Sequence, residues 1–216
     1  MKRLFELAEM IRDKDLRERT LKLLKNPESK SPTLKGYGPS ELSKMPVWVG
    51  AHHDYDGGFV DHTVGVTELC LSMAKSFEKV YGREMGKAAK GGVNYDHLIA
   101  GALLHDIGKV FIIKKADKEK QKLGMKWDFS GLMIDHAVLS ANLLHEHGFP
   151  EEVVHMVASH GGDMGAASAS PKTIEAWLLV QADNLDAQFE SSVLHPSLNL
   201  QQLQFLLNPQ AESERK

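Results

Sequence analysis

The amino-acid sequence predicts an all-helical domain with one short β-hairpin. Apolar residues recur at helical spacing along most of the chain, and capping residues stand before several of these segments. Only two short stretches near the middle of the chain have the character of strands. The 216 residues are enough for one well-buried domain and short for two.

The composition is that of a soluble globular protein, with 42% hydrophobic and 25% charged residues. A net charge of -3 gives no overall electrostatic case for nucleic-acid binding, although a local basic groove is compatible with it. No apolar run is long enough to cross a membrane, and the N-terminus lacks the apolar core of a signal peptide. The single cysteine, Cys70, excludes an internal disulfide and fits a reducing compartment. We therefore expect a cytoplasmic protein without a membrane or a disulfide-linked partner.

Two helices and an irregular segment open the chain. Apolar residues keep helical spacing over residues 4–11, and a second helix over residues 16–24 has Asp13 or Asp15 as its N-terminal cap. Residues 26–46 are rich in Pro, Gly, Ser and Lys, which predicts an irregular segment laid across a surface.

The next segment concentrates possible ligands. Residues 47–58 are rich in aromatic, acidic and imidazole side chains, including His52 and His53. A helix follows over residues 59–81, where apolar residues keep the helical period. His62 lies four residues before an apolar position of this helix, so it points toward the core.

The middle of the chain predicts a loop, a helix and a hairpin. Residues 82–92 are rich in Lys and Gly and predict a solvated loop. A strongly apolar helix follows, with Asn94 or Asp96 near its start. Residues 110–113 and 125–129 would then form two short strands, joined by a charged, solvent-exposed turn.

Two polar residues, His105 and Asp106, end the apolar helix side by side. Burying an imidazole and a carboxylate is costly unless they are paired or coordinate a cation. Gly108 predicts a left-handed helix cap, after which Lys109 would be a mobile positive charge. For a lone dipeptide, a satisfied core histidine with a carboxylate partner would be the better interpretation. It is less favoured here because the chain contains more ligands of the same kind.

Three further helices carry these ligands. Ser130 can cap a helix that contains His136 and stops at Gly148. Pro150 begins a second helix, which ends next to His160.

The last of the three helices opens at Ser170-Pro171 and contains Asp183, a carboxylate in an otherwise apolar stripe. Before it, residues 163–169 are small and predict a rim loop, and a short helix is expected from Ser197. The chain thus divides into three predicted parts: N-terminal helices and crossing segment (1–46), core domain (47–190), and C-terminal helix and tail (191–216).

Six polar residues interrupt apolar helix faces, and imidazole and carboxylate together suit the divalent metals Mn, Fe, Co, Ni and Zn. With no thiolate among them, a structural zinc site is not expected. A first metal could take His62, His105, Asp106 and Asp183. A second could take His136 and His160, with Asp106 bridging the two metals.

A centre of one or two such metals predicts phosphoester chemistry. Two metals about 3.5–4 Å apart would clamp a phosphate and activate water for in-line attack. Lys109 would neutralise phosphate charge or help the leaving group. His52 and His53 are candidates for substrate contact, with a role in loop structure as the alternative. No phosphate-binding Gly-rich loop is present, and no pattern indicates a covalent nucleophile.

The order of these motifs resembles the HD superfamily of metal-dependent phosphohydrolases, and in particular the HD domain of bacterial 3′→5′ exoribonucleases. The resemblance implies an HD-domain helical bundle in which Asp106 and Lys109 are catalytic. It covers about residues 45 to 190. The matching segments are 52–63, 102–109, 131–141, 159–161 and 182–187.

Two features depart from the relatives. The β-rich OB-fold module that precedes the exoribonuclease domain is absent before Trp48, and Gly161 stands where a second histidine follows His160. The chain is also similar in ligand order to cyclic-dinucleotide HD-GYP enzymes, but it lacks their Gly-Tyr-Pro signature.

The resemblance implies a phosphohydrolase that cleaves a phosphoester of a nucleotide, cyclic nucleotide or oligonucleotide by metal-activated water. One alternative is a 3′→5′ exonuclease on single-stranded RNA or DNA. Another is a non-catalytic module that binds metal or nucleotide as a sensor. The retention of Lys109 and all six ligand candidates favours an enzyme.

Overall fold

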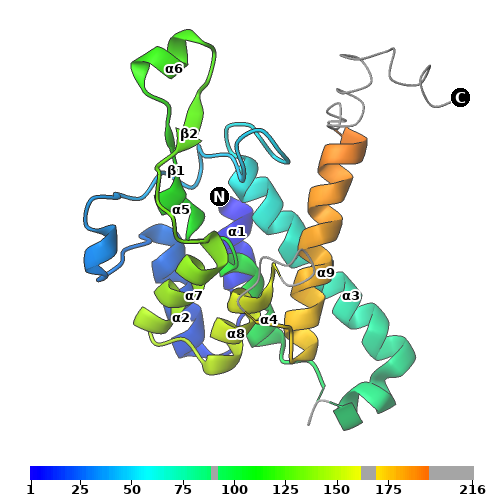
Figure 1. The fold of residues 1–216 in the computed structure, drawn as a ribbon. Coiled ribbons are helices and arrows are strands. Elements are labelled where there is room, and N and C mark those ends of the chain that lie inside the picture. The colour runs from blue at the N-terminus through cyan, green and yellow to red at the C-terminus, as the bar shows by residue number, and fades with distance from the viewer. Residues whose placement is uncertain (89–91, 162–168, 195–216) are drawn as a thin grey trace, which may run out of the picture.

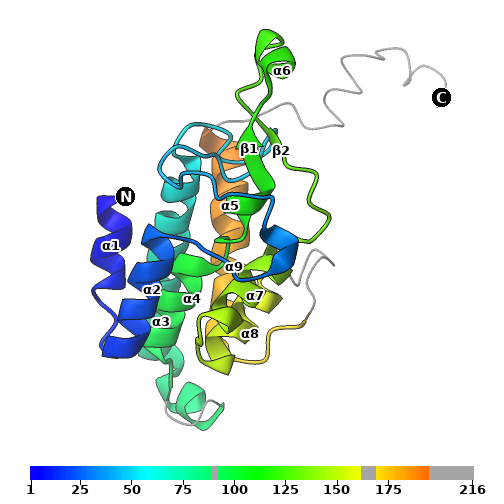
Figure 2. The ribbon, with the colours of Figure 1, turned by 90° about the vertical axis from the view of Figure 1, so that its left-hand side faces the viewer.

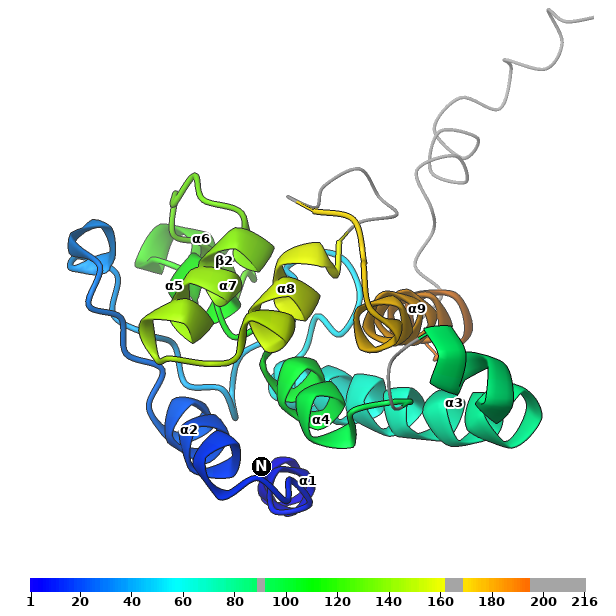
Figure 3. The same cartoon turned by 90° about the horizontal axis from the view of Figure 1, so that it is seen from below.

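Helix α4 (Tyr95–Leu104) lies at the centre of the fold and contacts α1, α2, α3, α8 and α9 (Figure 3). Every residue from Leu98 to Leu104 is buried, as the strongly apolar sequence of this segment predicts. The Asn94 side chain caps the helix by accepting the His97 backbone N–H at 3.1 Å. Because α4 ends inside the molecule, the residues that follow it emerge in the interior.

The structure is a computed structural model that describes residues 1–88, 92–161 and 169–194. Its described residues form a helical domain with one small sheet (Figure 1), which confirms the predicted fold class. Besides α4, the elements are α1 (Lys2–Ala8), α2 (Lys14–Lys25), η1 (Pro32–Leu34), α3 (Gly58–Ala88), α5 (Lys109–Ile112), β1 (Ile113–Lys115), α6 (Lys118–Lys122), β2 (Trp127–Phe129), α7 (His136–Glu146), α8 (Glu151–Ser159), α9 (Ile174–Phe189) and the π-helical turn η3 (Glu190–Leu194).

The other helices surround α4. Helices α1 and α2 lie on one side of it, and α7 and α8 on the other (Figure 2). Helices α3 and α9 pack against each other and against α4. Leu4, Leu7 and Leu23 are fully buried in the same core as Leu103, so the predicted N-terminal helices do form. Asp13 caps α2 by accepting the Leu16 N–H at 2.8 Å.

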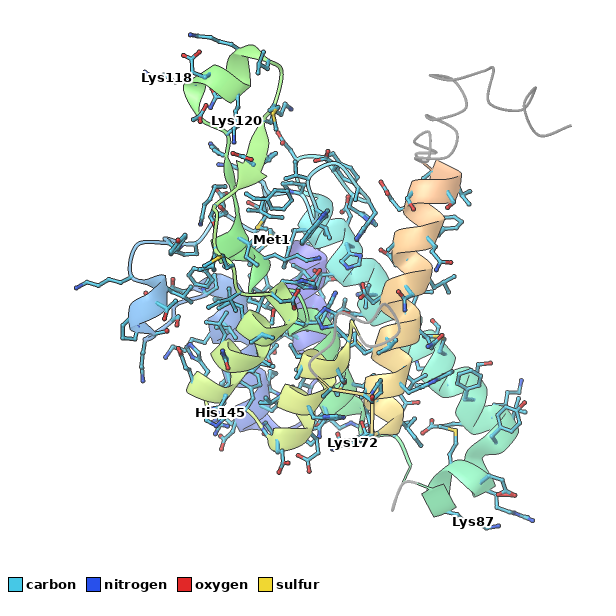
Figure 4. The ribbon with its side chains drawn as sticks, in the orientation of Figure 1. Met1, Lys87, Lys118, Lys120, His145 and Lys172 are labelled. Atoms are coloured by element: carbon cyan, nitrogen blue, oxygen red, sulfur yellow. The ribbon has the colours of Figure 1, made fainter. Side chains whose placement is uncertain are left out.

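The hairpin projects from the helical body, with Lys118 and Lys120 at its tip (Figures 1 and 4). Strands β1 and β2 pair antiparallel, with Ile113 opposite Phe129. The predicted strand over residues 110–113 is wrong for all but its last residue, since Val110 to Ile112 lie in α5. That short helix is buried throughout, so tertiary packing overrides the strand propensity of its β-branched residues.

Three predicted helix boundaries are also wrong. Helix α3 continues to Ala88 through the segment predicted as a loop, because two glycines cost only about 1 kcal/mol each among good helix formers. Helix α7 begins at His136 and is capped by Asp135, not by Ser130. Helix α9 begins at Ile174 with Thr173 as its cap, a few residues after the predicted start.

None of the helices in the described part of the chain is long and apolar enough to cross a membrane. The predicted rim loop lies outside the described residues except for Ala169, and the predicted helix from Ser197 lies wholly outside them. The division of the chain into residues 1–46, 47–190 and 191–216 stays a prediction.

Candidate metal centre

The six predicted ligands come together where five helical segments meet. Each is placed at or near a helix end or on an inward face of its helix. They are His62 in the first turns of α3, His105 and Asp106 directly after α4, His136 at the start of α7, His160 directly after α8, and Asp183 on α9.

The first group surrounds the Nε2 atom of His62. This atom lies 3.2 Å from Nε2 of His105 and 3.2 Å from Oδ1 of Asp183. Oδ2 of Asp106 lies 3.5 Å from His62 Nε2 and 3.4 Å from His105 Nε2. The donor atoms of His62, His105 and Asp106 lie close enough together to hold one cation, and Asp183 Oδ1 lies within 3.7 Å of both imidazole nitrogens.

The second group faces the other oxygen of the same carboxylate. Nε2 of His136 and Nε2 of His160 lie 3.2 Å apart. Each is 3.6 Å from Oδ1 of Asp106. Asp106 therefore presents one oxygen to each group and occupies the bridging position between them.

The donor set fits divalent cations. The Nδ1 atoms of His105 and His160 face the carbonyl oxygens of Ala102 and Val157 at 2.8 and 2.6 Å. Because a carbonyl only accepts hydrogen bonds, these Nδ1 atoms carry protons, and a neutral ring then leaves Nε2 as a bare acceptor. Acceptors 3.2 Å apart repel each other unless a proton or a cation stands between them.

Asp106 gives a second sign of a cation site. Its Oδ1 is buried and has no hydrogen-bond partner among the described residues, which is costly for a carboxylate oxygen. A cation shared with His136 and His160 would satisfy it. Imidazole and carboxylate ligands without thiolate suit Mn, Fe, Co, Ni or Zn.

The electrostatics keep the carboxylates ionised. Burial raises the pKa of Asp106, but Lys109 and His105 lower it more, and the net pKa lies well below its ordinary value. The same balance, with His62 as the main favourable partner, lowers the pKa of Asp183. Burial lowers the pKa of His62, but the Asp106 and Asp183 carboxylates raise it well above 6.5 in the protein without metal. In the protein without metal, the proton on His62 therefore lies where a cation would bind.

Lys109 is not the mobile charge that the sequence predicts. Gly108 has a right-handed conformation, with φ -64°, and Lys109 is the buried first residue of α5. Glycine is needed here for close packing, since a Cβ would lie 2.8 Å from the backbone of both His136 and Ser140. Lys109 Nζ donates to Asp106 Oδ2 at 2.6 Å.

His52 and His53 lie beside the first group. Their rings are 5.1 and 5.2 Å from the His62 ring, centroid to centroid, and their Nδ1 atoms are 3.1 Å apart. Burial lowers the pKa of His52 to about 3, so its ring is neutral at physiological pH. Their role in substrate contact stays a prediction.

Two residues near the candidate centre were not predicted as site residues from the sequence. Oδ2 of Asp186 lies 2.7 Å from Nδ1 of His62, and the spacing of Asp186 three residues after Asp183 was the available signal. The centroid of the Trp48 ring lies 5.8 Å from that of the His136 ring. Lys109 Nζ lies 5.4 Å from the same Trp48 centroid. Because Trp48 lies in an irregular loop, the spacing of residues around it does not show which way its side chain points.

Two of the candidate ligands are partly exposed to solvent. The His136 and Asp183 side chains are 19% and 21% exposed, whereas those of His62 and Asp106 are at most 1% exposed. The Trp48 ring packs edge-on against the ring of His136. Solvent therefore reaches the candidate centre at His136 and Asp183.

Three relatives found by comparison with known proteins cleave phosphodiester bonds, as their names state. The dihydroneopterin 2′,3′-cyclic phosphate phosphodiesterase of Methanocaldococcus jannaschii is 39% identical over 189 residues, which cover 87% of this chain and 69% of that protein. The 3′-5′ exoribonuclease YhaM of Oceanobacillus iheyensis is 31% identical over 68% of this chain, and that of Bacillus pumilus is 30% identical over 76%. The chain spans 44% and 50% of those two exoribonucleases. No solved structure matches.

The family model described as HD domain matches residues 59–188. That span includes all six residues of the candidate metal centre and excludes His52 and His53. The resemblance found in the sequence motifs is confirmed. The chain belongs to the HD domain family and is a metal-dependent phosphohydrolase.

Proposed function

We propose that this phosphohydrolase is a phosphodiesterase that opens the 2′,3′-cyclic phosphate of a nucleotide or a related compound. The observation that carries the proposal is the Asp106 carboxylate, which presents one oxygen to each of two histidine groups. Such a pair of sites suits phosphodiester hydrolysis, because two cations would stabilise the attacking oxygen of water and the leaving oxygen of the ester together. The similarity to a cyclic phosphate phosphodiesterase over most of the chain supports this substrate class.

The metal ligands in this proposal are the two groups described above. His62, His105 and Asp183 with Oδ2 of Asp106 would hold one cation, and His136 and His160 with Oδ1 would hold another. When bound, divalent cations at these positions would supply Lewis acidity and lower the pKa of water near the phosphorus. The number of cations and their identity belong to the proposal.

The protein's own groups then have distinct tasks. Asp106, ionised and buried, fixes the distance between the two histidine groups. Lys109 holds Oδ2 of Asp106 at 2.6 Å and adds a positive charge beside the phosphate, which favours charge development toward the leaving oxygen. The neutral ring of His52 can donate or accept hydrogen bonds at the substrate, and the ring of His53 lies beside it.

The experiment is a substrate comparison with the Mn²⁺-loaded protein. Cytidine 2′,3′-cyclic phosphate and dihydroneopterin 2′,3′-cyclic phosphate would be followed by ³¹P NMR, with the corresponding monophosphates as controls. We expect ring opening to a single monophosphate and no further release of inorganic phosphate. Release of inorganic phosphate from the monophosphates, with the cyclic compounds untouched, would contradict the proposal.

A second candidate activity is 3′→5′ exonuclease action. The sequence similarity to two exoribonucleases favours this activity, although the chain spans half or less of their length. A 5′-labelled single-stranded oligoribonucleotide separates the two activities. Stepwise shortening from the 3′ end at a rate above that of cyclic phosphate opening would favour the exonuclease. Turnover of no phosphodiester would favour the sensor alternative.

A further inference from the structure

The Asp186 carboxylate touches the nitrogen of His62 that faces away from the metal centre. Its Oδ2 lies 2.7 Å from His62 Nδ1. Nε2 of the same ring faces Asp183 at 3.2 Å and Asp106 at 3.5 Å. Because an ionised carboxylate only accepts hydrogen bonds, this contact assigns a proton to Nδ1 and leaves Nε2 to bind a cation.

A glycine makes this contact possible. A Cβ atom added at Gly65 would lie 2.3 Å from Oδ1 of Asp186 and 3.2 Å from its Cγ. Side-chain carbons do not approach oxygen so closely, so any larger residue would displace the carboxylate. Gly65 on α3 therefore permits Asp186 on α9 to reach His62 across the interface between these helices.

The Nδ1 atoms of the other candidate ligand histidines have neighbours close by in the sequence. Nδ1 of His105 and Nδ1 of His160 each face a carbonyl oxygen three residues earlier in the chain. Nδ1 of His136 makes no hydrogen bond among the described residues, although the carboxylate of the preceding residue, Asp135, lies 3.3 Å from it. His62 differs because its orienting partner comes from another helix, 124 residues away in the sequence.

We propose that Asp186 is a positioning residue that holds His62 in the tautomer and orientation required for metal binding, and that Gly65 is required for this contact. The inference rests on the proposed metal centre. Carboxylates that accept the second N–H of a metal-bound histidine commonly raise metal affinity by about 10- to 100-fold. The same Oδ2 lies 3.5 Å from Nε2 of His53, so Asp186 also touches the loop that borders the centre.

The test measures Mn²⁺ affinity by competition with a fluorescent chelator, independently of turnover. Asp186→Ala should weaken the tighter site about 10- to 100-fold. Asp186→Asn keeps an amide oxygen that accepts from Nδ1, so it should recover most of this loss. Gly65→Ala should weaken binding as Asp186→Ala does, and the double variant should be no weaker than either, as expected for one shared interaction. Gly82→Ala is the matched control on α3, because a Cβ there meets nothing within 4 Å.

A spectroscopic measurement separates positioning from a general loss of structure. In the Zn²⁺-loaded protein, the Nδ1–H proton of His62 should be protected from solvent exchange, and Asp186→Ala should abolish that protection. Unchanged Mn²⁺ affinity in Asp186→Ala or Gly65→Ala would overturn the inference. So would Asp186→Asn as weak as Asp186→Ala, since charge rather than the hydrogen bond would then matter. A wild-type protein that binds no Mn²⁺ would instead contradict the proposed metal centre.

Discussion

At the scale of single residues, the buried charge of Asp106 most needs partners. It is 1% exposed, it pairs with Lys109, and its Oδ1 has no hydrogen bond among the described residues. A buried carboxylate in this state needs positive charge beside it, and Lys109 supplies one such charge from the chain itself.

Asp106→Ala should abolish Mn²⁺ binding and turnover and should destabilise the protein without metal by about 3–5 kcal/mol, because it leaves the Lys109 ammonium buried and unpaired. Elemental analysis and chemical denaturation measure these effects. The double variant Asp106→Ala/Lys109→Met is the control. It should regain much of the stability but none of the metal, and full metal content in either variant would refute the assignment of Asp106.

Lys109→Met tests the lysine alone. Its loss should lower kcat by about 10²-fold with a smaller change in KM, as for a donor that acts on developing charge. The loss should be smaller for an aryl phosphodiester, whose leaving group needs less help. Metal content measured alongside should stay close to wild type. Unchanged kcat on both substrates would remove Lys109 from the mechanism.

The pH dependence follows from the raised pKa values of His62 and His160, where carboxylate partners outweigh burial. A raised folded-state pKa stabilises the metal-free protein below the unfolded value of about 6.5, and this stabilisation is lost as pH rises through the folded pKa. Metal must displace these protons, so Mn²⁺ affinity should change in the opposite direction and increase with pH. Calorimetric titration in two buffers of different ionisation enthalpy should show proton release, and affinity independent of pH would contradict this account.

At the scale of elements, the turn between α4 and α5 decides where His105 and Asp106 point. The Gly108 N–H donates to Ser140 Oγ at 2.8 Å, which ties the turn to α7. The absence of a Cβ lets the two backbones meet. Packing of this turn therefore sets the distance between the two histidine groups.

Gly108→Ala should destabilise the protein without metal by about 1–3 kcal/mol, the usual cost of forcing extra atoms into a packed site. Metal affinity should fall with it, because the turn carries Asp106. Gly82→Ala on the exposed part of α3 should be neutral or stabilising by up to about 1 kcal/mol. Equal unfolding midpoints for the two variants in urea would show that the contact at Gly108 is not tight.

The elements that could be predicted from the sequence are those marked by a local pattern, such as a capping residue or a polar residue on an apolar helix face. Asn94 marked the start of α4, and each ligand stood out because it interrupted an apolar helix face. Residues 110–112 could not be assigned correctly, because burial on all sides removes the periodicity that separates helix from strand. The role of Asp186 could not be assigned either, since spacing shows which face a residue occupies but not which helix lies opposite.

At the scale of the whole molecule, the proposed centre joins helices from across the chain. Its ligands come from α3, α7, α9 and the ends of α4 and α8, so a bound cation would hold these elements together. A ligand that binds only the folded state stabilises it by mass action, about 2.7 kcal/mol at one hundred times its Kd. The thermal midpoint should therefore rise with Mn²⁺ concentration, and a midpoint that does not respond would mean that these helices share no metal.

The count of Mn²⁺ ions per chain tests the bridged centre most directly. Elemental analysis of wild-type protein, stripped with chelator, reloaded and desalted, should give two ions. The His136→Ala variant should keep one, because His62, His105 and Asp183 still face Oδ2 of Asp106. Two ions in the wild type and one in the variant are the result that this account predicts. One ion in both, with unchanged phosphodiester turnover, would contradict it.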